Sequence, residues 1–404
     1  MQLTGDQQLL KGLNRMAIVR HLCTHPGQSR ATVAESLRLT KSTVSLLVRE
    51  LMDEGWVLER DIVATGELGR RPTPLLIDPT RLVLLGAELG VESVQVVATS
   101  LTGTILARAA RNLDAEREAQ AGVALVAQLL LEVQARLDAD VQQVIGIGIG
   151  LPGGVDELSG HLHFAPNLGW RDVPAGAWLA GHLRDTPLNG IPLYLQNEAD
   201  VAALGELEFT RDARPDPLIY LSLSHGVGAG VIVDDRLLTG AHGFAGEVGH
   251  TILQMDGPLC SCGRHGCAEA VIGFRAMLSP ARAKRAKPTS LQEIKQLLRA
   301  DKPDTADAVA RAGRYLGMLL QNLIAAYDPG CIVLGGAAVE LGTVFLDPAL
   351  QTLRAYSSAA GMAPPQVAMS RFGADAVAVG AAALARYRLT RPLMAASGIA
   401  AISV

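Results

Sequence analysis

Three of the five cysteines of this chain stand close together, and a histidine precedes them at the spacing of a metal site. The four residues are His250, Cys260, Cys262 and Cys267. One imidazole and three thiolates are a ligand set that a tetrahedral structural zinc ion prefers. The alternatives are a disulfide cluster or unconnected thiols, but three is an odd number and Cys260-Ser-Cys262 is a tight spacing for a bridge. The sequence therefore predicts a structural Zn²⁺ site between His250 and Cys267.

The chain has 404 residues, 49% of them hydrophobic, which is enough to build two or three domains with substantial cores. Its formal net charge of −4 excludes neither nucleic acids nor small molecules as ligands. The first twenty residues contain no apolar signal-peptide core, and no uncharged apolar stretch is long enough to span a membrane. We therefore expect a cytoplasmic protein with no membrane partner, in a compartment where zinc-bound thiolates persist.

The amino-terminal part has the pattern of three helices. The first begins near Leu9 and breaks at His25-Pro26-Gly27, and the second starts at Ser29, which is a good N-cap residue. The third is expected from Thr40 to Gly55 and buries one apolar stripe, made of Val44, Leu47, Val48 and Leu51. A short helix, a turn and a longer helix with a polar outer face predict a helix-turn-helix.

A β-hairpin is expected directly after these helices. Trp56–Arg60 and Thr73–Ile77 have the pattern of two strands, with the basic pair Arg70 and Arg71 at the tip between them. Helix, turn, helix and hairpin in this order predict a winged helix that binds DNA. The alternatives are a helical domain with a solvated polar face and a winged helix that binds protein. The expected DNA contacts are Lys41, Ser42, Thr43, Ser45, Arg49, Arg70 and Arg71.

A plan of three short β-segments occurs twice in the rest of the chain. The first copy comprises 83–89, 94–100 and 104–109, and the second comprises 218–223, 230–234 and 237–238. Each copy is followed later by a hydrophobic strand that ends in small residues, at 144–154 and 331–336. Helices are expected around 115–137, 199–209, 272–299 and 304–327. Two similar lobes of this kind predict a ligand cleft between them.

Two glycine-rich loops raise the question of phosphate binding. The segments 225–230 and 335–336 could offer backbone amides to a phosphate, but hairpin turns need glycine equally, and we favour the structural interpretation. The corresponding loop of the first lobe, Glu88-Leu-Gly90-Val-Glu92, holds two carboxylates where a polyphosphate would sit. Like charges at that distance are costly in a partly buried site, so the sequence disfavours nucleotide binding.

Amide and carboxylate side chains suited to a polyol are scattered through the body. Such groups donate to and accept from vicinal hydroxyls, which is how a polar pocket distinguishes sugars. Each also has a simpler explanation, for example Asn197 as a helix N-cap or Glu269 as a surface acid. Their combination favours a sugar pocket made of Asn167, Asn197, Glu198, Glu247, His250 and Glu269.

Four motifs make the chain resemble the ROK family, which groups sugar-responsive repressors with sugar kinases. The most specific is the cysteine run with its leading Glu247-x-Gly-His250, and the others are Pro-Asn167-Leu-x-Trp170, Asn197-Glu198-Ala-Asp-x-Ala-Ala203 and Gly-Arg-Arg-Pro72. The winged helix and its basic tip resemble the regulators of this family, such as the xylose and N-acetylglucosamine repressors.

The resemblance implies an α/β fold in which a winged helix-turn-helix precedes a two-lobed, actin-like (ribonuclease-H-like) sugar-kinase fold. The expected parts are residues 1–80 for DNA binding, 81–205 plus a C-terminal helix at about 376–390 for the first lobe, and 206–375 for the second lobe with the zinc site. It also implies that Asn167, Asn197, Glu247, His250 and Glu269 contact sugar hydroxyls and that His250 also binds zinc.

Two departures from the kinases of the family bear on enzymatic activity. Glu198 occupies the position of the kinase general base, which is usually aspartate, and Glu88–Glu92 replaces the phosphate loop Asp-x-Gly-Gly-Thr. Both disfavour phosphoryl transfer, which depends on positioning and charge stabilisation around the phosphates. We therefore expect no catalytic residue, and we expect the protein to be a sugar-responsive repressor. It should act as a homodimer or homotetramer that binds operator DNA and a sugar or sugar phosphate. The alternative is a sugar kinase that retains a DNA-binding domain.

Overall fold

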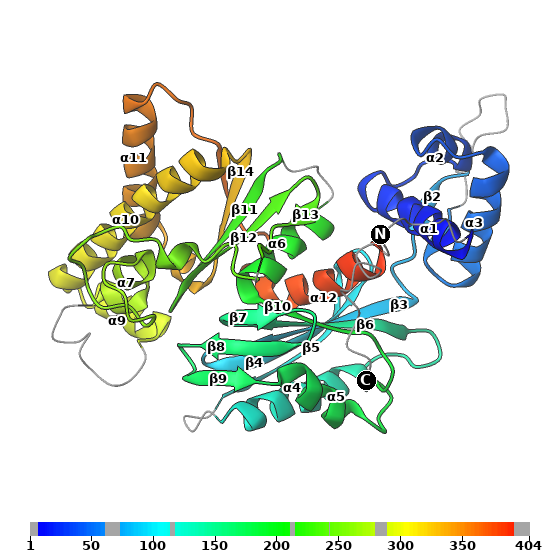
Figure 1. Cartoon of the computed structure of the whole chain (residues 1–404), viewed down its shortest axis with the longest axis horizontal. Coiled ribbons are helices and arrows are strands. Elements are labelled where there is room, and N and C mark those ends of the chain that lie inside the picture. Colours follow the sequence, from blue (N-terminus) through cyan, green and yellow to red (C-terminus); the bar gives the residue numbers. More distant parts are fainter. Residues whose placement is uncertain are drawn as a thin grey trace.

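The computed structural model of the chain describes residues 7–60, 73–113, 118–210, 215–241, 243–278 and 289–391. It is an α/β structure with a small amino-terminal unit beside a two-lobed body (Figure 1). The predicted Arg70 and Arg71 lie outside the described residues. None of the described helices is long and apolar enough to cross a membrane.

The amino-terminal unit (residues 7–60 and 73–80), which we call the winged-helix unit, contains the helices and strands that the sequence predicts, and residues 61–72 lie outside the described part of the chain. It contains α1 (Gln7–Thr24), α2 (Arg30–Ser36), α3 (Lys41–Asp53), and the antiparallel strands β1 (Val57–Glu59) and β2 (Leu75–Ile77). The Ser29 hydroxyl caps α2 by accepting from the Thr32 amide at 3.2 Å, and Thr40 caps α3 in the same way at 3.1 Å from the Thr43 amide. The predicted stripe of α3 is buried. The helices and strands expected here are therefore confirmed.

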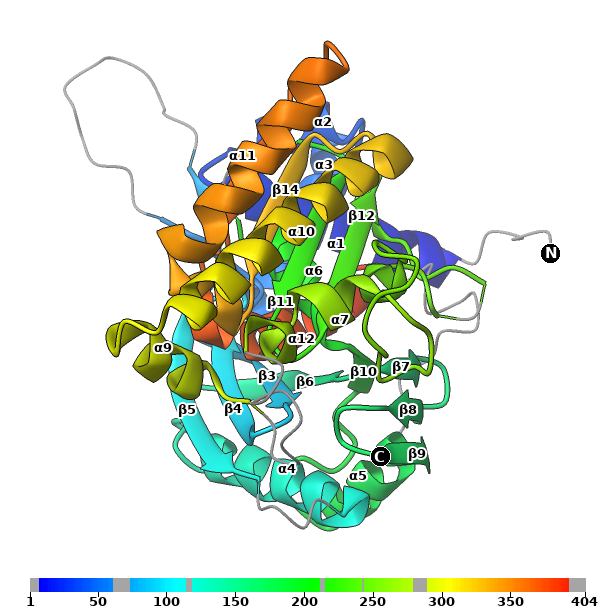
Figure 2. The same ribbon diagram turned by 90° about the vertical axis from the view of Figure 1, so that its left-hand side faces the viewer.

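The first lobe is built on a five-stranded mixed sheet in the order β10-β6-β3-β4-β5. Its strands are β3 (Leu82–Leu89), β4 (Ser93–Ser100), β5 (Ile105–Asn112), β6 (Gln143–Leu151) and β10 (Leu193–Asn197). Helices α4 (Ala119–Gln134) and α5 (Ala175–Leu183) lie on one side of it, as Figure 2 shows. A three-stranded antiparallel sheet extends the lobe, with strands β7 (Gly154–Asp156), β8 (His161–Ala165) and β9 (Trp170–Val173).

The second lobe repeats this topology. Its sheet has the order β13-β12-β11-β14-β15. The first four of these strands have the same chain order and the same relative directions as β5-β4-β3-β6 of the first lobe. Its strands are β11 (Leu218–Leu223), β12 (Val227–Val233), β13 (Arg236–Leu237), β14 (Cys331–Gly335) and β15 (Gln366–Met369). Helices α10 (Pro303–Tyr327) and α11 (Thr343–Ala359) pack together on its outer side (Figure 2). The predicted repeat of two lobes is confirmed.

The single helix predicted over 272–299 is wrong. Helix α7 (Ala268–Ile272) ends at Gly273, whose backbone is extended, and a 3₁₀ turn follows at Phe274–Met277. A separate helix, α9 (Leu291–Arg299), begins after the Ser290 N-cap, and residues 279–288 lie outside the described part of the chain. Helices α7 and α9 both contain apolar residues, so the apolar pattern continues past Gly273. The glycine itself is the residue that could have indicated the end of a helix.

Two helices occupy the centre of the molecule, α6 (Glu198–Glu208) and α12 (Ala376–Leu389) (Figure 1). They pack against each other, and α12 also lies on β3 and β6 of the first lobe. The approach is close, because a Cβ on Gly86 would lie 2.0 Å from the Ala378 carbonyl oxygen and one on Gly148 only 1.8 Å from that of Ala381. The alternating glycines of β6 therefore face α12, while Ile147 and Ile149 fill the core on the other side.

Candidate functional site

All six predicted sugar-binding residues line one cavity, which we call the acidic pocket: Asn167, Asn197, Glu198, Glu247, His250 and Glu269. They come from both lobes. Asn197 ends β10, Glu198 begins α6, Asn167 follows β8, and Glu247 and Glu269 flank the cysteine run of the second lobe. Gly226, in the turn between β11 and β12, lies close to two of them. A Cβ at this position would be 2.9 Å from Glu269 Oε2 and 3.2 Å from Asn167 Nδ2, so a larger residue would crowd both side chains.

Asn197 serves the fold as well as the pocket. Its Oδ1 accepts from the Ala199 amide at 2.8 Å, which caps α6, and its Nδ2 donates to the Gly153 carbonyl oxygen at 2.9 Å. The N-cap interpretation of this residue is thus correct, and the second hydrogen bond ties the first-lobe loop to the start of α6. This loop also lines the acidic pocket.

The carboxylates of the pocket are crowded. Burial, together with the nearby carboxylates of Glu269 and Glu247, raises the pKa of Glu198 to about 7. Burial also raises the pKa of Asp200, whose Oδ1 has no hydrogen-bond partner within the described residues. Asp200 lines the same cavity and was not singled out from the sequence, although it lies in the quoted Asn197 motif. Hydroxyl donors of a ligand would satisfy these acceptors.

The four predicted metal ligands also come together. The candidate ligand atoms of His250, Cys260, Cys262 and Cys267 all lie within 4.8 Å of one another. Cys262 Sγ is 3.7 Å from Cys267 Sγ, and Cys260 Sγ is 3.7 Å from His250 Nδ1. At this separation the two sulfur atoms are not bonded to each other, and both cysteines are free thiols. The separation is close to the roughly 3.8 Å edge of a tetrahedron with Zn–S bonds of about 2.3 Å. These residues therefore fit a tetrahedral metal ion.

His250 faces the metal ligands and the pocket with different nitrogens. Its Nδ1 is the atom near Cys260 Sγ, whereas its Nε2 lies 3.8 Å from Glu247 Oε2. Ser261, between two of the cysteines, donates from its hydroxyl to Glu269 Oε1 at 2.7 Å. The segment from His250 to Cys267, which we call the cysteine loop, thus contacts two acids of the pocket. A metal ion that orders this loop would also orient those acids.

A second cavity, of about 280 Å³, shares Asn167 and Glu198 with the acidic pocket. It is lined by Glu88 and Glu92 from the first lobe and by Gly335-Gly336 from the second. Burial, and secondarily Glu198 and Asp375, raises the pKa of Glu88 to about 8. The glycines serve packing, since a Cβ on Gly335 would lie 1.9 Å from the Tyr220 hydroxyl and one on Gly336 would lie 2.4 Å from the Leu223 carbonyl oxygen. Two acids thus share this cavity with close-packed glycines.

We expect the Glu88→Gln variant to be more thermostable than the wild type at high pH. The raised pKa means that folding favours the protonated acid, so this contribution is fully present below the unfolded pKa near 4.5 and is lost as the pH rises through about 8. The variant should melt several degrees higher at pH 9 and nearly the same at pH 5. Thermal unfolding across this pH range measures it. The exposed Glu118→Gln control should follow the wild type, and a Glu88→Gln profile parallel to it would contradict the assignment.

Comparison with known proteins decides the family. The sequence pattern of the ROK family matches residues 84–388. The chain belongs to the ROK family. It is 29% identical to the xylose repressor of Caldicellulosiruptor bescii over 94% of this chain and 97% of that protein.

Two solved ROK structures resemble the fold. One is a ROK family transcriptional regulator, a homolog of the E. coli MLC protein, with a TM-score of 0.74, 23% identity, and coverage of 96% of this chain and 99% of that one. The other is the ROK family glucokinase from Streptomyces griseus, in complex with glucose and AMPPNP, with a TM-score of 0.65 and 27% identity, covering 75% of this chain and 99% of that one. The regulator thus matches the fold over nearly the whole chain.

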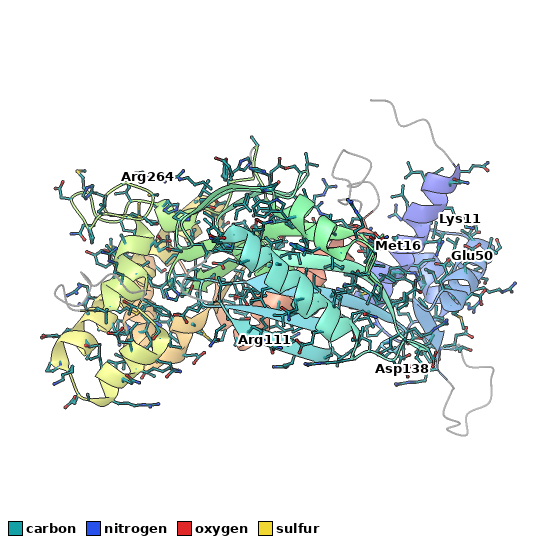
Figure 3. All side chains as sticks on the ribbon, turned by 90° about the horizontal axis from the view of Figure 1, so that it is seen from below. Lys11, Met16, Glu50, Arg111, Asp138 and Arg264 are labelled. Atoms are coloured by element: carbon teal, nitrogen blue, oxygen red, sulfur yellow. The ribbon has the colours of Figure 1, made fainter. Side chains whose placement is uncertain are left out.

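The outer face of α3 in this ROK protein presents part of the predicted DNA-binding set. Lys41, Ser42 and Arg49 are exposed, while Thr43 and Ser45 are partly buried. The Thr43 hydroxyl is 2.8 Å from that of Thr40, so it takes part in the helix cap. Lys11 of α1 pairs with Glu50 of α3 at 2.7 Å, and this ion pair links the two helices (Figure 3).

An ionic network with a buried centre, formed by Glu208, Arg386 and Arg391, contacts the winged-helix unit from the body. Glu208, at the end of α6, accepts from Arg386 Nε of α12 at 2.8 Å and from Arg391 Nη1 at 2.7 Å. Arg391 also donates to Asp235 at 2.8 Å, and Arg386 Nη1 lies 3.5 Å from Cys23 Sγ of α1. We call Glu208, Arg386, Arg391 and Asp235 the arginine–glutamate network. It borders a cavity of about 460 Å³ between α1 and the body, and the sequence reasoning missed it.

Proposed function

We propose that this ROK protein is a sugar-responsive transcriptional repressor whose effector is a sugar or sugar phosphate. The observation that supports this most is that one chain carries both the acidic pocket between its lobes and a winged helix with an exposed polar face. The xylose repressor it resembles matches over 94% of this chain, winged-helix unit included. The effector sugar would bind between the lobes, and operator DNA would bind at α3.

Within the pocket, the proposed contacts are Asn167, Asn197, Glu198, Glu247, His250 and Glu269, with Asp200 behind them. Zn²⁺ would be held by the three cysteines and by His250 Nδ1, which leaves His250 Nε2 directed toward Glu247 and the pocket. When bound, the zinc ion would hold the cysteine loop in one conformation and would take part in no reaction step. Its role is to keep the cysteine loop in the conformation that directs Glu247 and Glu269 at the ligand.

In this proposal, sugar binding at the acidic pocket has to change DNA binding at α3, which lies in a different part of the molecule. Arg264, in the cysteine loop, lies at the opposite end of the molecule from Lys11 and Glu50 of the winged-helix unit (Figure 3). Helix α6 joins these regions, because Asn197 and Glu198 at its start line the pocket and Glu208 at its end holds the arginine–glutamate network. Its 11 residues form a rod of about 16 Å. Closure of the cleft would shift α6 and α12 and thereby the winged-helix unit.

We further propose that the protein acts as a homodimer or homotetramer. Two winged helices that read a palindromic operator would be set at a spacing that depends on the state of the cleft. The sugar then changes operator affinity by its differential binding to the two states, and by linkage DNA changes sugar affinity by the same factor. Fluorescence anisotropy with labelled DNA from the chain's own promoter, titrated with pentoses, hexoses and N-acetyl amino sugars, tests this. The proposal fails if no sugar changes the affinity for DNA.

The sugar-kinase alternative is disfavoured by the second cavity. Glu88 and Glu92 line it on the side where the family's kinases carry their phosphate loop, and Glu198 stands at the position of the kinase base. We propose that the protein does not transfer phosphate. A coupled assay for ADP release with magnesium ATP and the same sugars should show no sugar-dependent turnover, and sustained turnover would overturn this part of the proposal.

Arg49→Ala is expected to weaken DNA binding about tenfold, within the 1–3 kcal/mol that one specific contact contributes. Arg49 is exposed on α3, away from the buried stripe that holds the helix in place, so the fold should be unaffected. Anisotropy titrations at several salt concentrations measure both the affinity and the salt slope, which should fall by about one if Arg49 binds a phosphate.

The control for this experiment is Arg111→Ala, which removes a surface arginine of β5 that pairs with Glu132 at 3.0 Å. It changes the net charge equally but lies in the first lobe, and it should bind DNA as the wild type does. Equal losses in both variants would indicate nonspecific attraction rather than a contact from α3.

A further inference from the structure

The small sheet of the first lobe carries a second group of metal-ligating side chains. His161 and His163 lie on β8, and Asp172 lies on the neighbouring β9. Their candidate ligand atoms all lie within 4.8 Å of one another. We propose that His161, His163 and Asp172 form a second metal site, specific for a divalent transition-metal ion and independent of the cysteine loop.

The register of the strands produces this group. Leu162 pairs with Val173 and Phe164 pairs with Arg171, so His163 and Asp172 stand opposite each other between these pairs. Residues opposite each other in an antiparallel sheet point to the same face, and so do residues two apart in one strand. His161 and His163 therefore share one face, and Asp172, whose backbone φ of 52° departs from a regular strand, brings its carboxylate close to them. On the other face, Leu162 and Val173 are buried in the core of the first lobe.

The geometry needs only small side-chain rotations to close around an ion. His161 Nε2 is 3.9 Å from Asp172 Oδ1, and the two imidazole rings meet edge to face with centroids 5.3 Å apart. Donor atoms about 2.1 Å from a tetrahedral ion are roughly 3.4 Å apart. The Asp172 side chain is 84% exposed and free to rotate, whereas His161 is 31% exposed and held by the sheet. His161 is thus the less mobile ligand, and the exposed His163 and Asp172 side chains can adjust around an ion.

A second acid, Asp156, lies on the same face as His161. Asp156 of β7 pairs with His161 across the strands, and its carboxylate accepts from the Leu158 amide and the Ser159 hydroxyl, each at 2.9 Å. It adds negative charge beside the ligands without being free to replace one of them. Two imidazoles and a carboxylate suit Zn²⁺, Ni²⁺ or Co²⁺, whereas Mg²⁺ and Ca²⁺ prefer sites made of oxygen alone. Water would complete the coordination on the exposed side.

The site adjoins a contact between the two lobes. The His163 ring lies 6.2 Å from that of Phe244, which precedes Glu247 in the second lobe and also packs against Phe164 at 5.6 Å. A metal ion on His163 would therefore restrain the first-lobe side of this aromatic contact. If the proposed sugar response is correct, metal binding here should change sugar affinity, but the existence of the site does not depend on that response.

Metal stoichiometry of the full-length, tag-free protein tests the site. Protein with its cysteine loop loaded with zinc is titrated with Ni²⁺ by calorimetry and equilibrium dialysis, and zinc is measured in parallel. The wild type should bind one further Ni²⁺ per chain without releasing zinc. His163→Ala and His161→Ala should each weaken this binding at least tenfold, with unchanged zinc content and melting temperature. Asp172→Asn should weaken it less.

The matched control is His25→Ala, which removes one ring of the stacked His21–His25 pair in the winged-helix unit, with centroids 4.8 Å apart. This variant should bind nickel as the wild type does. The proposal is overturned if the wild type takes up no ion beyond its zinc, if His163→Ala retains the extra nickel, or if His25→Ala loses it. A missing sugar response would leave these outcomes unaffected, so the two proposals fail separately.

Discussion

The Cys262→Ser variant is expected to lose its zinc ion and to bind the effector sugar at least tenfold more weakly. In the proposed zinc site the thiolates would supply three of the four ligands, and Cys262 Sγ lies 3.7 Å from Cys267 Sγ, so loss of one thiolate would open the tetrahedron. Structural zinc contributes directly to folding, since the ligands are brought together only in the ordered loop. Zinc content by atomic emission and sugar affinity by calorimetry measure the two effects.

The loss of sugar affinity follows from what the loop contacts. Ser261 donates to Glu269 at 2.7 Å, and His250 Nε2 lies 3.8 Å from Glu247 Oε2, so a disordered loop would release both acids. Crowding by the other carboxylates would then turn them away from the ligand. Mutations that disturb the outer support of a metal site commonly cost 10–100-fold in function, which sets the expected size.

Cys331→Ala provides the control, because it removes a buried cysteine of β14 that is not among the metal ligands. It should retain one zinc ion per chain and the wild-type sugar affinity. A Cys262→Ser protein that contains no zinc but binds sugar normally would show that the loop has no orienting role. A protein that retains zinc would show that the ligand set is different.

The sequence was sufficient to predict the residues that motifs mark directly. His250 and the three cysteines lie in one short segment, whereas the six residues of the acidic pocket lie far apart in the chain. Each has a residue type that suits the chemistry proposed for it. The helix caps Ser29 and Thr40 and the buried stripe of α3 followed from local rules, since capping and helical periodicity depend on near neighbours.

Features that depend on tertiary packing could not be predicted in this way. Gly86 and Gly148 are needed because α12 lies against them, and the sequence does not show which helix will cover a strand. Glu208 and Arg386 are 178 residues apart, and each is of a type usually found at the surface. Helix α7 ends at Gly273, although the apolar pattern of the sequence continues beyond it. The pattern continues because α7 and α9 both bury apolar side chains in the same core.

The arginine–glutamate network leads to the second prediction with a large effect. Glu208 is almost fully buried, and its carboxylate binds two guanidinium groups whose side chains are 4% and 7% exposed. Removing one partner of a buried ion pair leaves uncompensated charge, which costs about 3–5 kcal/mol. Glu208→Ala leaves both arginines without their carboxylate, so its melting temperature should fall by about 4–6 °C for a chain of this length. The surface control Glu132→Ala, which breaks pairs with Arg111 and Arg136, should change it by little more than a degree.

The same network predicts sensitivity to acid. Burial opposes ionisation of Glu208, but Arg386 and Arg391 more than offset it and hold the pKa of this carboxyl below its usual value. A lowered pKa in the folded state stabilises the protein above the unfolded value near 4.5, and this stability is lost as the pH falls through the lower folded value. Glu208→Gln should therefore be less stable than the wild type at pH 7 and should lose less stability on acidification. Thermal unfolding from pH 7 to pH 3 measures the difference.

The consequence for regulation can be separated from stability. Because Glu208 ends the helix that begins at the pocket, Glu208→Gln should retain sugar binding while the sugar changes operator affinity less than it does in the wild type. Sugar affinity by calorimetry and operator affinity by anisotropy, each at a temperature where the variant is folded, give the two quantities independently. A variant that is destabilised but shows the full response would limit the network to a structural role. A variant that binds sugar normally and no longer responds would show that the coupling between the lobes and the winged-helix unit depends on the arginine–glutamate network.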